Sequence, residues 1–312
     1  MIQLFCMPDG VRHAHAGTQD IINIGGFASR IDSRSGWRAR DDGKSMAQTN
    51  VISDTLAGLG RMAIDPVQEL GRAAIFFFRG LVHLFSFPLQ ADKIVDQVYF
   101  IGMKSVFVIC LTGAFTGMVL GLQGYYTLVK FGSEGLLGAA VALSLIREMG
   151  PVLTAIMVVA RAGSAMAAEI GIMRISEQID ALETMDINPI RFLFSPRLGA
   201  ALIAFPFLTA IFDVVGIFGG YVTGSLLLGI NPGLYFSRVE SSVLMEDING
   251  GFIKAFCFAA IVATICCYQG YTTHMRKEGF GAKGVSLSTT SAVVISCVLI
   301  LVADYVLTSF LL

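Results

Sequence analysis

Four charged residues stand inside one long apolar stretch of the sequence, between positions 135 and 171. They are Arg147, Glu148, Arg161 and Glu169. A charge at membrane depth costs at least about 2.5 kcal/mol on insertion scales, and it persists where it pairs, faces a wet cavity or takes part in function. These side chains are therefore the first candidates for chemistry, namely the recognition or gating of a polar group in apolar surroundings.

The spacing of these charges predicts a polar stripe along one side of a helix. Arg161 follows Arg147 by 14 residues, and a regular helix brings it back to within roughly 40° of the same face. Glu169 comes eight residues later and falls on a neighbouring face. Two interpretations remain open: the stripe lines a cavity, or it forms internal salt bridges that fix the helix register.

Enzymatic chemistry finds little support in the sequence. The segment 42–45 (DGKS) resembles the end of a phosphate-binding loop, but Arg38 stands where such a loop needs its first glycine. No GxSxG, HExxH or CxxC motif is present, and Ser164 has only Glu169 as a nearby base in sequence. We expect no catalytic residue, no metal site and no cofactor; a membrane enzyme acting on lipids is one alternative.

The composition of the chain indicates a membrane protein. Of its 312 residues, 54% are hydrophobic and 14% are charged, whereas soluble domains carry about 25% charged residues. A bilayer accommodates this much apolar surface. The net charge of −1 and the lack of a basic stripe with interleaved aromatic residues argue against nucleic-acid binding. The composition therefore predicts the fold class of an all-α integral membrane protein.

Five apolar segments are long enough to cross a membrane as helices, at about 20 residues each. We predict spans at about 100–129, 135–168, 198–228, 251–275 and 286–311. The loops near positions 180 and 277 are basic, while the loop 229–250 is mostly acidic. Because basic loops stay on the cytoplasmic side, we expect the N-terminus and both basic loops to face the cytoplasm and the C-terminus to face outward.

The segment before the first span divides into two parts. Residues 51–87 carry apolar side chains at three- and four-residue steps, arginines between them and a Phe-Phe-Phe cluster at 76–78, which predicts an amphipathic helix in the membrane interface. A soluble helix capping the cytoplasmic face is the alternative. Residues 1–45 are polar and lack a signal-peptide core. We interpret them as disordered or as an over-extended reading frame, with the natural start at Met46.

The loop between the second and third spans contains a short predicted helix, Ser176–Met185, which ends before Asn188-Pro189. Its acidic residues recur at three-residue steps beside an apolar stripe: Glu177, Asp180 and Glu183. A charged helix in a cytoplasmic loop suits docking to a soluble partner, and a plain solvated loop is the alternative.

Two sets of glycines recur at four-residue steps within apolar segments. They are Gly113, Gly117 and Gly121, and Gly216, Gly220 and Gly224. This spacing lets helix backbones approach closely. The sequence leaves open whether either set packs within one protomer or between two.

A long run of the sequence, from Leu143 to Arg197, closely resembles the MlaE/YrbE family of ABC-transporter permeases. The resemblance is carried by ALSLIREMGPVLTAI and ARAGSAMAAEIGIMRISEQIDALETMDINPIRFLFSPR, preceded by GAFTGMVLGLQGY. It extends over about 46–312 as a permease domain with an N-terminal interfacial helix, five spans and a cytoplasmic coupling helix. The sequence departs mildly from the family pattern at Met185–Pro189.

The resemblance implies a subunit of a larger transporter. Such permeases are homodimers in the bacterial inner membrane, with a dimer of cytoplasmic ABC ATPase subunits beneath and a periplasmic MCE-domain lipid-binding protein above. ATP hydrolysis then belongs to a separate subunit, and the cargo is phospholipid moved between the inner membrane and the periplasmic carrier. A permease of the same family for a sterol, hydrocarbon or other apolar cargo, and a stand-alone membrane carrier, are the alternatives.

The resemblance and the charge pattern together give two groups of expected site residues. The expected lipid-pocket or gating residues are Glu169, Arg161, Arg147 and Glu148. The expected ATPase-coupling residues are Arg174, Glu177, Gln178, Asp180, Glu183 and Pro189. A diacyl lipid needs a wide apolar groove with a polar place for its headgroup, and the first group supplies the polar part.

Overall fold

The computed structural model of the chain describes residues 68–84, 91–275 and 281–311. Every regular element in these residues is helical, and none is a strand. The all-α membrane class predicted from the sequence is confirmed. The predicted extension 1–45, the start at Met46 and the first part of the interfacial helix, 51–67, lie outside the described residues.

Five helices in the described part of the chain are long and apolar enough to cross a membrane, as predicted. They run over Ala91–Val129, Glu134–Ile175, Ile190–Leu227, Met245–Tyr271 and Ala282–Leu311. The first three contain 39, 42 and 38 residues, about twice the roughly 20 residues that cross the hydrocarbon layer. These three helices therefore extend well beyond it.

The first three spans are built from α-helices joined by π-helical turns. The first contains α2 (Ala91–Val98), η1 (Tyr99–Met103) and α3 (Lys104–Val129). The second begins with the 3-10 turn η2 (Glu134–Leu136) and continues through α4 (Leu137–Ser144), η3 (Leu145–Met149), α5 (Gly150–Val158), η4 (Val159–Gly163) and α6 (Ser164–Ile175). The third contains η5 (Ile190–Phe194), α8 (Ser195–Tyr221) and η6 (Val222–Leu227).

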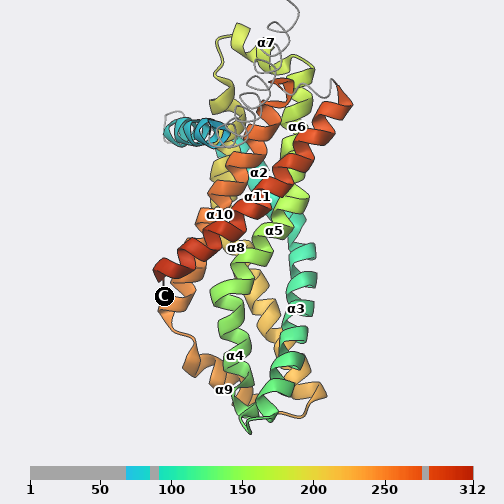
Figure 1. Cartoon of the computed structure of the whole chain (residues 1–312), viewed down its shortest axis with the longest axis vertical. Helices are drawn as coiled ribbons and strands as arrows, with labels where there is room; N and C mark the ends of the chain where they lie inside the picture. Colours follow the sequence, from blue (N-terminus) through green and yellow to red (C-terminus); the bar gives the residue numbers. More distant parts are fainter. Residues whose placement is uncertain (1–67, 85–90, 276–280, 312) are drawn as a thin grey trace, which may run out of the picture. The chain divides into compact units, whose positions relative to one another are not determined.

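The last two spans are uninterrupted α-helices, and short helices lie between the spans. The fourth and fifth spans are α10 (Met245–Tyr271) and α11 (Ala282–Leu311). The shorter elements are α7 (Gln178–Thr184), α9 (Pro232–Ser242) and the 3-10 turn η7 (Thr273–Met275). Figure 1 shows α7 at one end of the spanning helices and α9 beside α4 at the other.

Two π-helical turns in the second span change the directions in which its charges point. A π-helical turn adds a residue to the α-helical hydrogen-bond ladder, which rotates the later residues by about 100° relative to a regular helix. Arg147 lies within η3 and Arg161 within η4. The calculation for a regular helix, which places both arginines on one face, therefore does not describe this span.

Two glycines of each set pack against each other within one protomer, which answers the question that the sequence leaves open, while Gly224 faces the side chain of Leu137. A Cβ on Gly117 would overlap the carbonyl oxygen of Gly216, and a Cβ on Gly121 would lie 3.1 Å from the carbonyl oxygen of Gly220. Gly113 faces the backbone of Phe212 in the same way. The helices α3 and α8 therefore touch backbone to backbone over about two helical turns.

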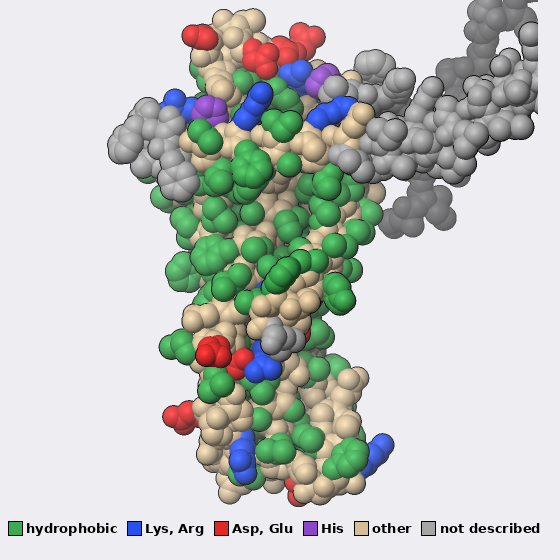
Figure 2. All heavy atoms as spheres, turned by 60° about the vertical axis from the view of Figure 1, so that its left-hand side comes forward, with side chains coloured by type: hydrophobic (Ala, Val, Ile, Leu, Met, Phe, Trp, Pro, Cys, Tyr) green, Lys and Arg blue, Asp and Glu red, His purple; other side chains and the backbone are tan. Residues whose placement is uncertain are grey.

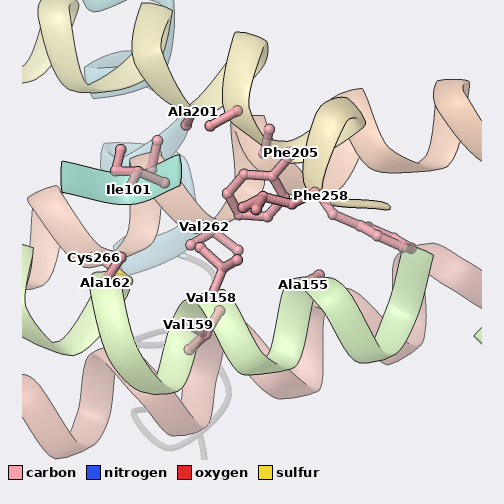
Figure 3. Packing of buried hydrophobic residues seen from close by; sticks show 14 of the residues in the cluster. Ile101, Ala155, Val158, Val159, Ala162, Ala201, Phe205, Phe258, Val262 and Cys266 are labelled. Atoms are coloured by element: carbon pink, nitrogen blue, oxygen red, sulfur yellow. The ribbon is translucent and has the colours of Figure 1, made fainter. Parts of the chain in front are cut away.

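The core lies where α10 passes between the second span and α8, as Figure 3 shows. The side chains buried there include Val158, Ala162, Phe205, Phe258 and Val262. Of the residues in the most apolar 18-residue stretch of α10, 61% are buried, whereas in the corresponding stretch of α11 only 11% are buried. The helix α11 therefore has one exposed apolar side, with Val298, Leu301 and Val302, that is available to lipid or to another protein. Figure 2 shows a broad zone of hydrophobic side chains on one face.

The helix over 68–84 is the described part of the predicted amphipathic helix, and Figure 1 shows it lying across the spans near the α7 end. Phe76 is buried against Phe194 and Tyr268, with ring centroids 4.6 and 5.9 Å apart. Phe78 on the opposite side is 63% exposed. A helix with one buried apolar face and further exposed phenylalanine and arginine side chains is suited to the membrane interface.

Candidate functional site

A buried ammonium group stands at the centre of the charged residues that the fold brings together. Lys254 of α10 is 2% exposed. Its Nζ lies 2.7 Å from Oε2 of Glu148 and 3.1 Å from Oδ1 of Asp304. The same Nζ donates to the carbonyl oxygen of Arg147 at 2.8 Å and to Oγ1 of Thr308 at 2.7 Å. Three helices, the second span, α10 and α11, thus meet at one lysine.

The local sequence explains why the lysine finds a partner on the second span. Pro151 has no N–H, so the carbonyl oxygen of Arg147, four residues earlier, loses its α-helical donor. Lys254 supplies the missing donor. Gly251, one turn earlier on α10, allows this approach, because a Cβ there would lie 2.8 Å from the carbonyl oxygen of Ile146.

A second ion pair lies beside the lysine, nearer the surface. Nε of Arg147 donates to Oδ1 of Asp247 at 2.7 Å. Oδ2 of Asp247 accepts from the backbone N–H of Leu244 at 3.0 Å, which fixes the carboxylate at the start of α10. The Arg147 side chain is 44% exposed. This pair therefore keeps a guanidinium group accessible at the rim of the site.

These charges line a cavity of about 540 Å³ between α4, η3, α10 and the end of α11. Its charged lining residues are Arg147, Glu148, Glu246, Asp247 and Lys254. Leu143 and Leu311 give it apolar walls. The volume lies within the range of about 300–1,000 Å³ that is usual for small-molecule sites. A cavity with both charges and apolar walls is suited to an amphipathic molecule. We call it the charged cavity.

The four charges expected to form the lipid site divide between three places. Arg147 and Glu148 both line the charged cavity. Arg161 instead donates to the carbonyl oxygen of Phe100 at 2.6 Å and to Oγ of Ser105 at 3.0 Å, which joins the second span to the first.

Glu169 forms a separate ion pair near the start of the third span. Its Oε2 lies 2.8 Å from Nη2 of Arg197, which is itself 4% exposed. Nη1 of Arg197 donates to the carbonyl oxygen of Leu193 at 2.8 Å. Neither Arg161 nor Glu169 lines the charged cavity. In this structure both join helices to each other, Glu169 through a salt bridge and Arg161 through hydrogen bonds.

The reasoning from sequence missed Lys254 and Asp304 as site residues. Each is the only charged residue in its predicted span, 251–275 or 286–311. A lone charge in an apolar segment is itself a signal of function or pairing. Nothing in the sequence pairs them with Glu148, because the three residues lie on three different helices.

The loop expected to couple to an ATPase is held to the ends of two spans. Nη1 of Arg174 donates to Oδ1 of Asp180 at 2.6 Å, and its Nε donates to Nδ1 of His274 at 3.0 Å. The hydroxyl group of Tyr271 donates to Oε1 of Glu183 at 3.4 Å. The short helix α7 is therefore connected both to the end of α6 and to the end of α10.

The predicted coupling residues differ in accessibility. Glu177, Gln178, Asp180 and Glu183 are exposed, whereas Pro189 is buried at the start of η5. Ile179 is fully buried and Met185 is 68% exposed. The helix α7 thus anchors itself by one apolar residue and presents an acidic surface with an apolar edge. This surface, from Glu177 to Met185, is called the α7 surface below.

No group of three or more His, Cys, Asp or Glu side chains in the part of the chain described by the structure is arranged to hold a metal ion. The described cysteines, at positions 110, 257, 266, 267 and 297, are free thiols.

Comparisons with known proteins agree with this architecture. Residues 94–310, from α2 to the end of α11, match the family model of the permease MlaE. The chain is 39% identical over 262 residues to the intermembrane phospholipid transport system permease protein MlaE of Haemophilus influenzae, covering 84% of this chain and 98% of that protein. It is 40% identical over 253 residues to a probable ABC transporter permease protein of Rickettsia typhi, covering 81% and 96%.

A plant protein is similar over the same part of the chain. The protein TRIGALACTOSYLDIACYLGLYCEROL 1, chloroplastic, of Arabidopsis thaliana is 37% identical over 240 residues, which cover 77% of this chain and 65% of the plant protein. The similarity therefore extends to relatives outside bacteria.

Proposed function

Because this chain belongs to the MlaE permease family, we propose that it is the transmembrane subunit of an ATP-binding-cassette transporter that moves phospholipids. In this proposal the chain lies in a bacterial inner membrane and exchanges lipid with a periplasmic MCE-domain lipid-binding protein. A dimer of cytoplasmic ABC ATPase subunits hydrolyses ATP, and the chain itself acts as a homodimer without catalysis. The relative from Haemophilus influenzae, named as a phospholipid transport permease, supports the cargo.

The observation that carries the proposal is the charged cavity around Lys254. A phospholipid headgroup has an anionic phosphate and often a cationic amine. Arg147 at the rim offers a guanidinium group to the phosphate, and charge-assisted contacts of this kind are strong. Glu148 and Glu246 offer carboxylates to an amine. The acyl chains have the exposed apolar side of α11, with Val298, Leu301 and Val302, along which to lie.

The second span connects the charged cavity to the α7 surface. It carries Arg147 and Glu148 in η3 and runs without a break to Ile175, just before α7. An ATPase dimer that contacts α7 differently in its two nucleotide states would shift this span between two positions. Because Lys254 holds η3 to α10 and α11, such a shift would also change the charged cavity.

One alternative cargo is suggested by the comparisons. The Arabidopsis thaliana relative is named after trigalactosyldiacylglycerol, which is a glycolipid without phosphate. A permease of this family for a sterol, a hydrocarbon or another apolar cargo would need fewer charges in its cavity than the five that line the charged cavity here. The charge content therefore favours a phospholipid.

The first test is a pull-down of the tagged protein from native membranes in mild detergent, with mass spectrometry of the proteins and lipids recovered. We expect an ABC ATPase, an MCE-domain protein and stoichiometric phospholipid. The variant Arg147→Ala should keep the ATPase and lose most of the phospholipid. Recovery of the chain alone and without lipid would contradict the proposal and favour a stand-alone carrier. Lipid turnover by the purified chain would favour a membrane enzyme.

A further inference from the structure

A second, smaller cavity of about 170 Å³ shares Gly251 with the charged cavity. It lies between α8, η3 and α10. Most of its lining is aliphatic or aromatic, and its polar side chains are Asp213 and Thr209, both on α8. Asp213 is the only titratable residue that lines it. The transport function proposed above makes no use of this cavity.

The two polar side chains of this cavity have buried atoms without a hydrogen-bond partner among the described residues. These atoms are Oδ1 of Asp213 and Oγ1 of Thr209. The two residues are one helical turn apart, and Thr209 is 2% exposed. Other threonines donate to the carbonyl oxygen four residues earlier, namely Thr112, Thr127, Thr264, Thr272, Thr289 and Thr290. The Thr209 hydroxyl group does not, so it remains available to the cavity.

The carboxyl group of Asp213 is packed against a backbone segment that offers it no donor. Its Oδ1 occupies the space that a Cβ of Gly150 would need. The N–H of Gly150 donates to the carbonyl oxygen of Leu145, and Pro151 has no N–H. Ile146 lines the same cavity, and its carbonyl oxygen faces Gly251. The backbone positions 150 and 151 therefore offer this carboxyl group no N–H donor.

The charged groups on the neighbouring helices are committed to other partners. On α10, Lys254 pairs with Glu148 and Asp304, and on η3, Arg147 pairs with Asp247. All of these side chains except Asp304 line the charged cavity, and none lines the cavity of Asp213. The residues that α10 does contribute to the smaller cavity are apolar or glycine. Among the described residues, no lysine or arginine of η3 or α10 therefore lines the cavity of Asp213.

We propose that Asp213 is a proton-binding site within the membrane, held as a neutral carboxylic acid, and a modification site for hydrophobic carbodiimides. An ionised carboxylate without a counter-charge is unfavourable at membrane depth. The neutral acid instead carries no charge and supplies an O–H donor to the cavity that it shares with the Thr209 hydroxyl group. The Thr209 hydroxyl group and the Ile146 carbonyl oxygen are the acceptors in reach of the same cavity.

The carbodiimide reaction depends on this proton. The acid proton moves to one carbodiimide nitrogen, and the carboxyl oxygen forms a bond to the central carbon, which gives an O-acylisourea. Transfer of the acyl group from oxygen to nitrogen then gives a stable N-acylurea of the same mass. No atom is lost and no other reagent is needed. An ionised and paired carboxylate such as Glu148 does not supply the proton.

The test uses the full chain in nanodiscs of phosphatidylethanolamine and phosphatidylglycerol, treated with dicyclohexylcarbodiimide at neutral pH. We expect one adduct, mapped by peptide mass spectrometry to Asp213 and absent from Asp213→Asn. The matched control, Asp304→Asn, should keep the adduct. Because the adduct is mapped on the wild-type protein, the test does not depend on the folding of either variant. Protection by Na⁺ or K⁺ would make Asp213 a cation ligand and overturn the proposal.

An infrared measurement decides the case in which the reagent does not react. A protonated carboxyl group has a carbonyl stretch at higher frequency than either stretch of a carboxylate. This band should be present in the wild type and be lost in Asp213→Asn. A wild-type protein with neither the adduct nor a band that Asp213→Asn removes would show that Asp213 is ionised, and the proposal would be wrong.

Discussion

The side chain of Lys254 replaces a hydrogen bond that Pro151 removes from another helix. Its Nζ donates at 2.8 Å to the carbonyl oxygen of Arg147, whose α-helical donor would be the N–H of residue 151. The same ammonium group neutralises Glu148 and Asp304. A single lysine therefore donates to a backbone acceptor and to one carboxylate, and forms an ion pair with a second carboxylate, at the meeting point of three helices.

Replacement of this lysine should weaken both stability and lipid binding. Lys254→Met keeps the length of the side chain but leaves the two carboxylates without their counter-charge and the Arg147 carbonyl oxygen without its side-chain donor. Removal of one partner from a buried ion pair costs about 3–5 kcal/mol. We expect the lower end of this range, because Glu148 is 41% exposed. Thermal unfolding in detergent and the amount of co-purified phospholipid measure the two effects.

The exposed Lys130 at the end of α3 provides the matched control for this change. Lys130→Met should leave the unfolding temperature and the phospholipid content as in the wild type. If Lys254→Met unfolds at the wild-type temperature, the ion pairs around Lys254 contribute nothing to stability. Unchanged phospholipid in that variant would remove Lys254 from the lipid site.

The contact between α3 and α8 should be sensitive to a single methyl group. In Gly117→Ala, the new Cβ would overlap the carbonyl oxygen of Gly216, which belongs to a backbone that cannot rotate away. Overpacking of this kind costs about 1–3 kcal/mol. A lower unfolding temperature in detergent is therefore expected, and an unchanged one would contradict the close packing of the two glycine sets.

A second glycine gives the opposite expectation for the same substitution. Gly71 lies in the helix over 68–84, and a Cβ there would meet nothing within 4 Å. Alanine is favoured over glycine within helices by about 0.8–1 kcal/mol. Gly71→Ala should therefore leave the unfolding temperature unchanged or raise it, which separates a steric effect from a general effect of adding a methyl group.

The spans were predictable because their signal is local. An apolar run of about 20 residues is visible in the sequence whatever it packs against. The glycine sets were visible for the same reason, but the pairing of Gly117 with Gly216 depends on which helices become neighbours. Sequence spacing alone does not show which glycine packs against which, so the contact between α3 and α8 within the protomer became evident only from the structure.

About half of the candidate site could be predicted from the sequence, and the rest could not, for two physical reasons. Arg147 and Glu148 attracted attention as charges at membrane depth, and both line the charged cavity. The π-helical turns η3 and η4 shift the face on which Arg161 lies, and an extra residue in a hydrogen-bond ladder has no clear signal in composition or periodicity. Lys254 was visible as a lone charge, but its partners come from helices distant in sequence.

Tyr235 of α9 should give the protein a dependence on alkaline pH. Its hydroxyl group donates to the carbonyl oxygen of Ile217 at 3.0 Å, and burial raises its pKa above the usual value for tyrosine. Above pH of about 10, tyrosine in the unfolded chain loses its proton while Tyr235 in the folded chain keeps it. Unfolding then releases a proton, so the stability that Tyr235 contributes falls as the pH rises.

The variant Tyr235→Phe isolates this contribution. At pH 8 it should lower the free energy of unfolding by about 1 kcal/mol, since one hydrogen bond is lost. Between pH 8 and pH 11 the difference from the wild type should shrink, because only the wild type has this group to ionise on unfolding. Tyr126→Phe, which removes an exposed hydroxyl group, should change stability at pH 8 by less than about 0.5 kcal/mol. A constant difference between Tyr235→Phe and the wild type would contradict the assignment.

Charge reversal on the α7 surface should separate the protein from its ATPase without unfolding it. Glu177 and Glu183 are exposed, and the side-chain hydrogen bond that the change removes is the long, exposed one from Tyr271 to Glu183 at 3.4 Å. Glu177→Lys with Glu183→Lys therefore costs little stability but turns an acidic docking surface basic. Like charges placed across an interface cost enough to weaken binding by about tenfold or more. Co-purification of the ATPase from native membranes measures the loss.

Glu134→Lys with Glu240→Lys makes the same change in charge on exposed residues near α4 and α9, at the opposite end of the spans, and should keep the ATPase bound. Equal recovery of the ATPase with both double variants would exclude the α7 surface as the docking site.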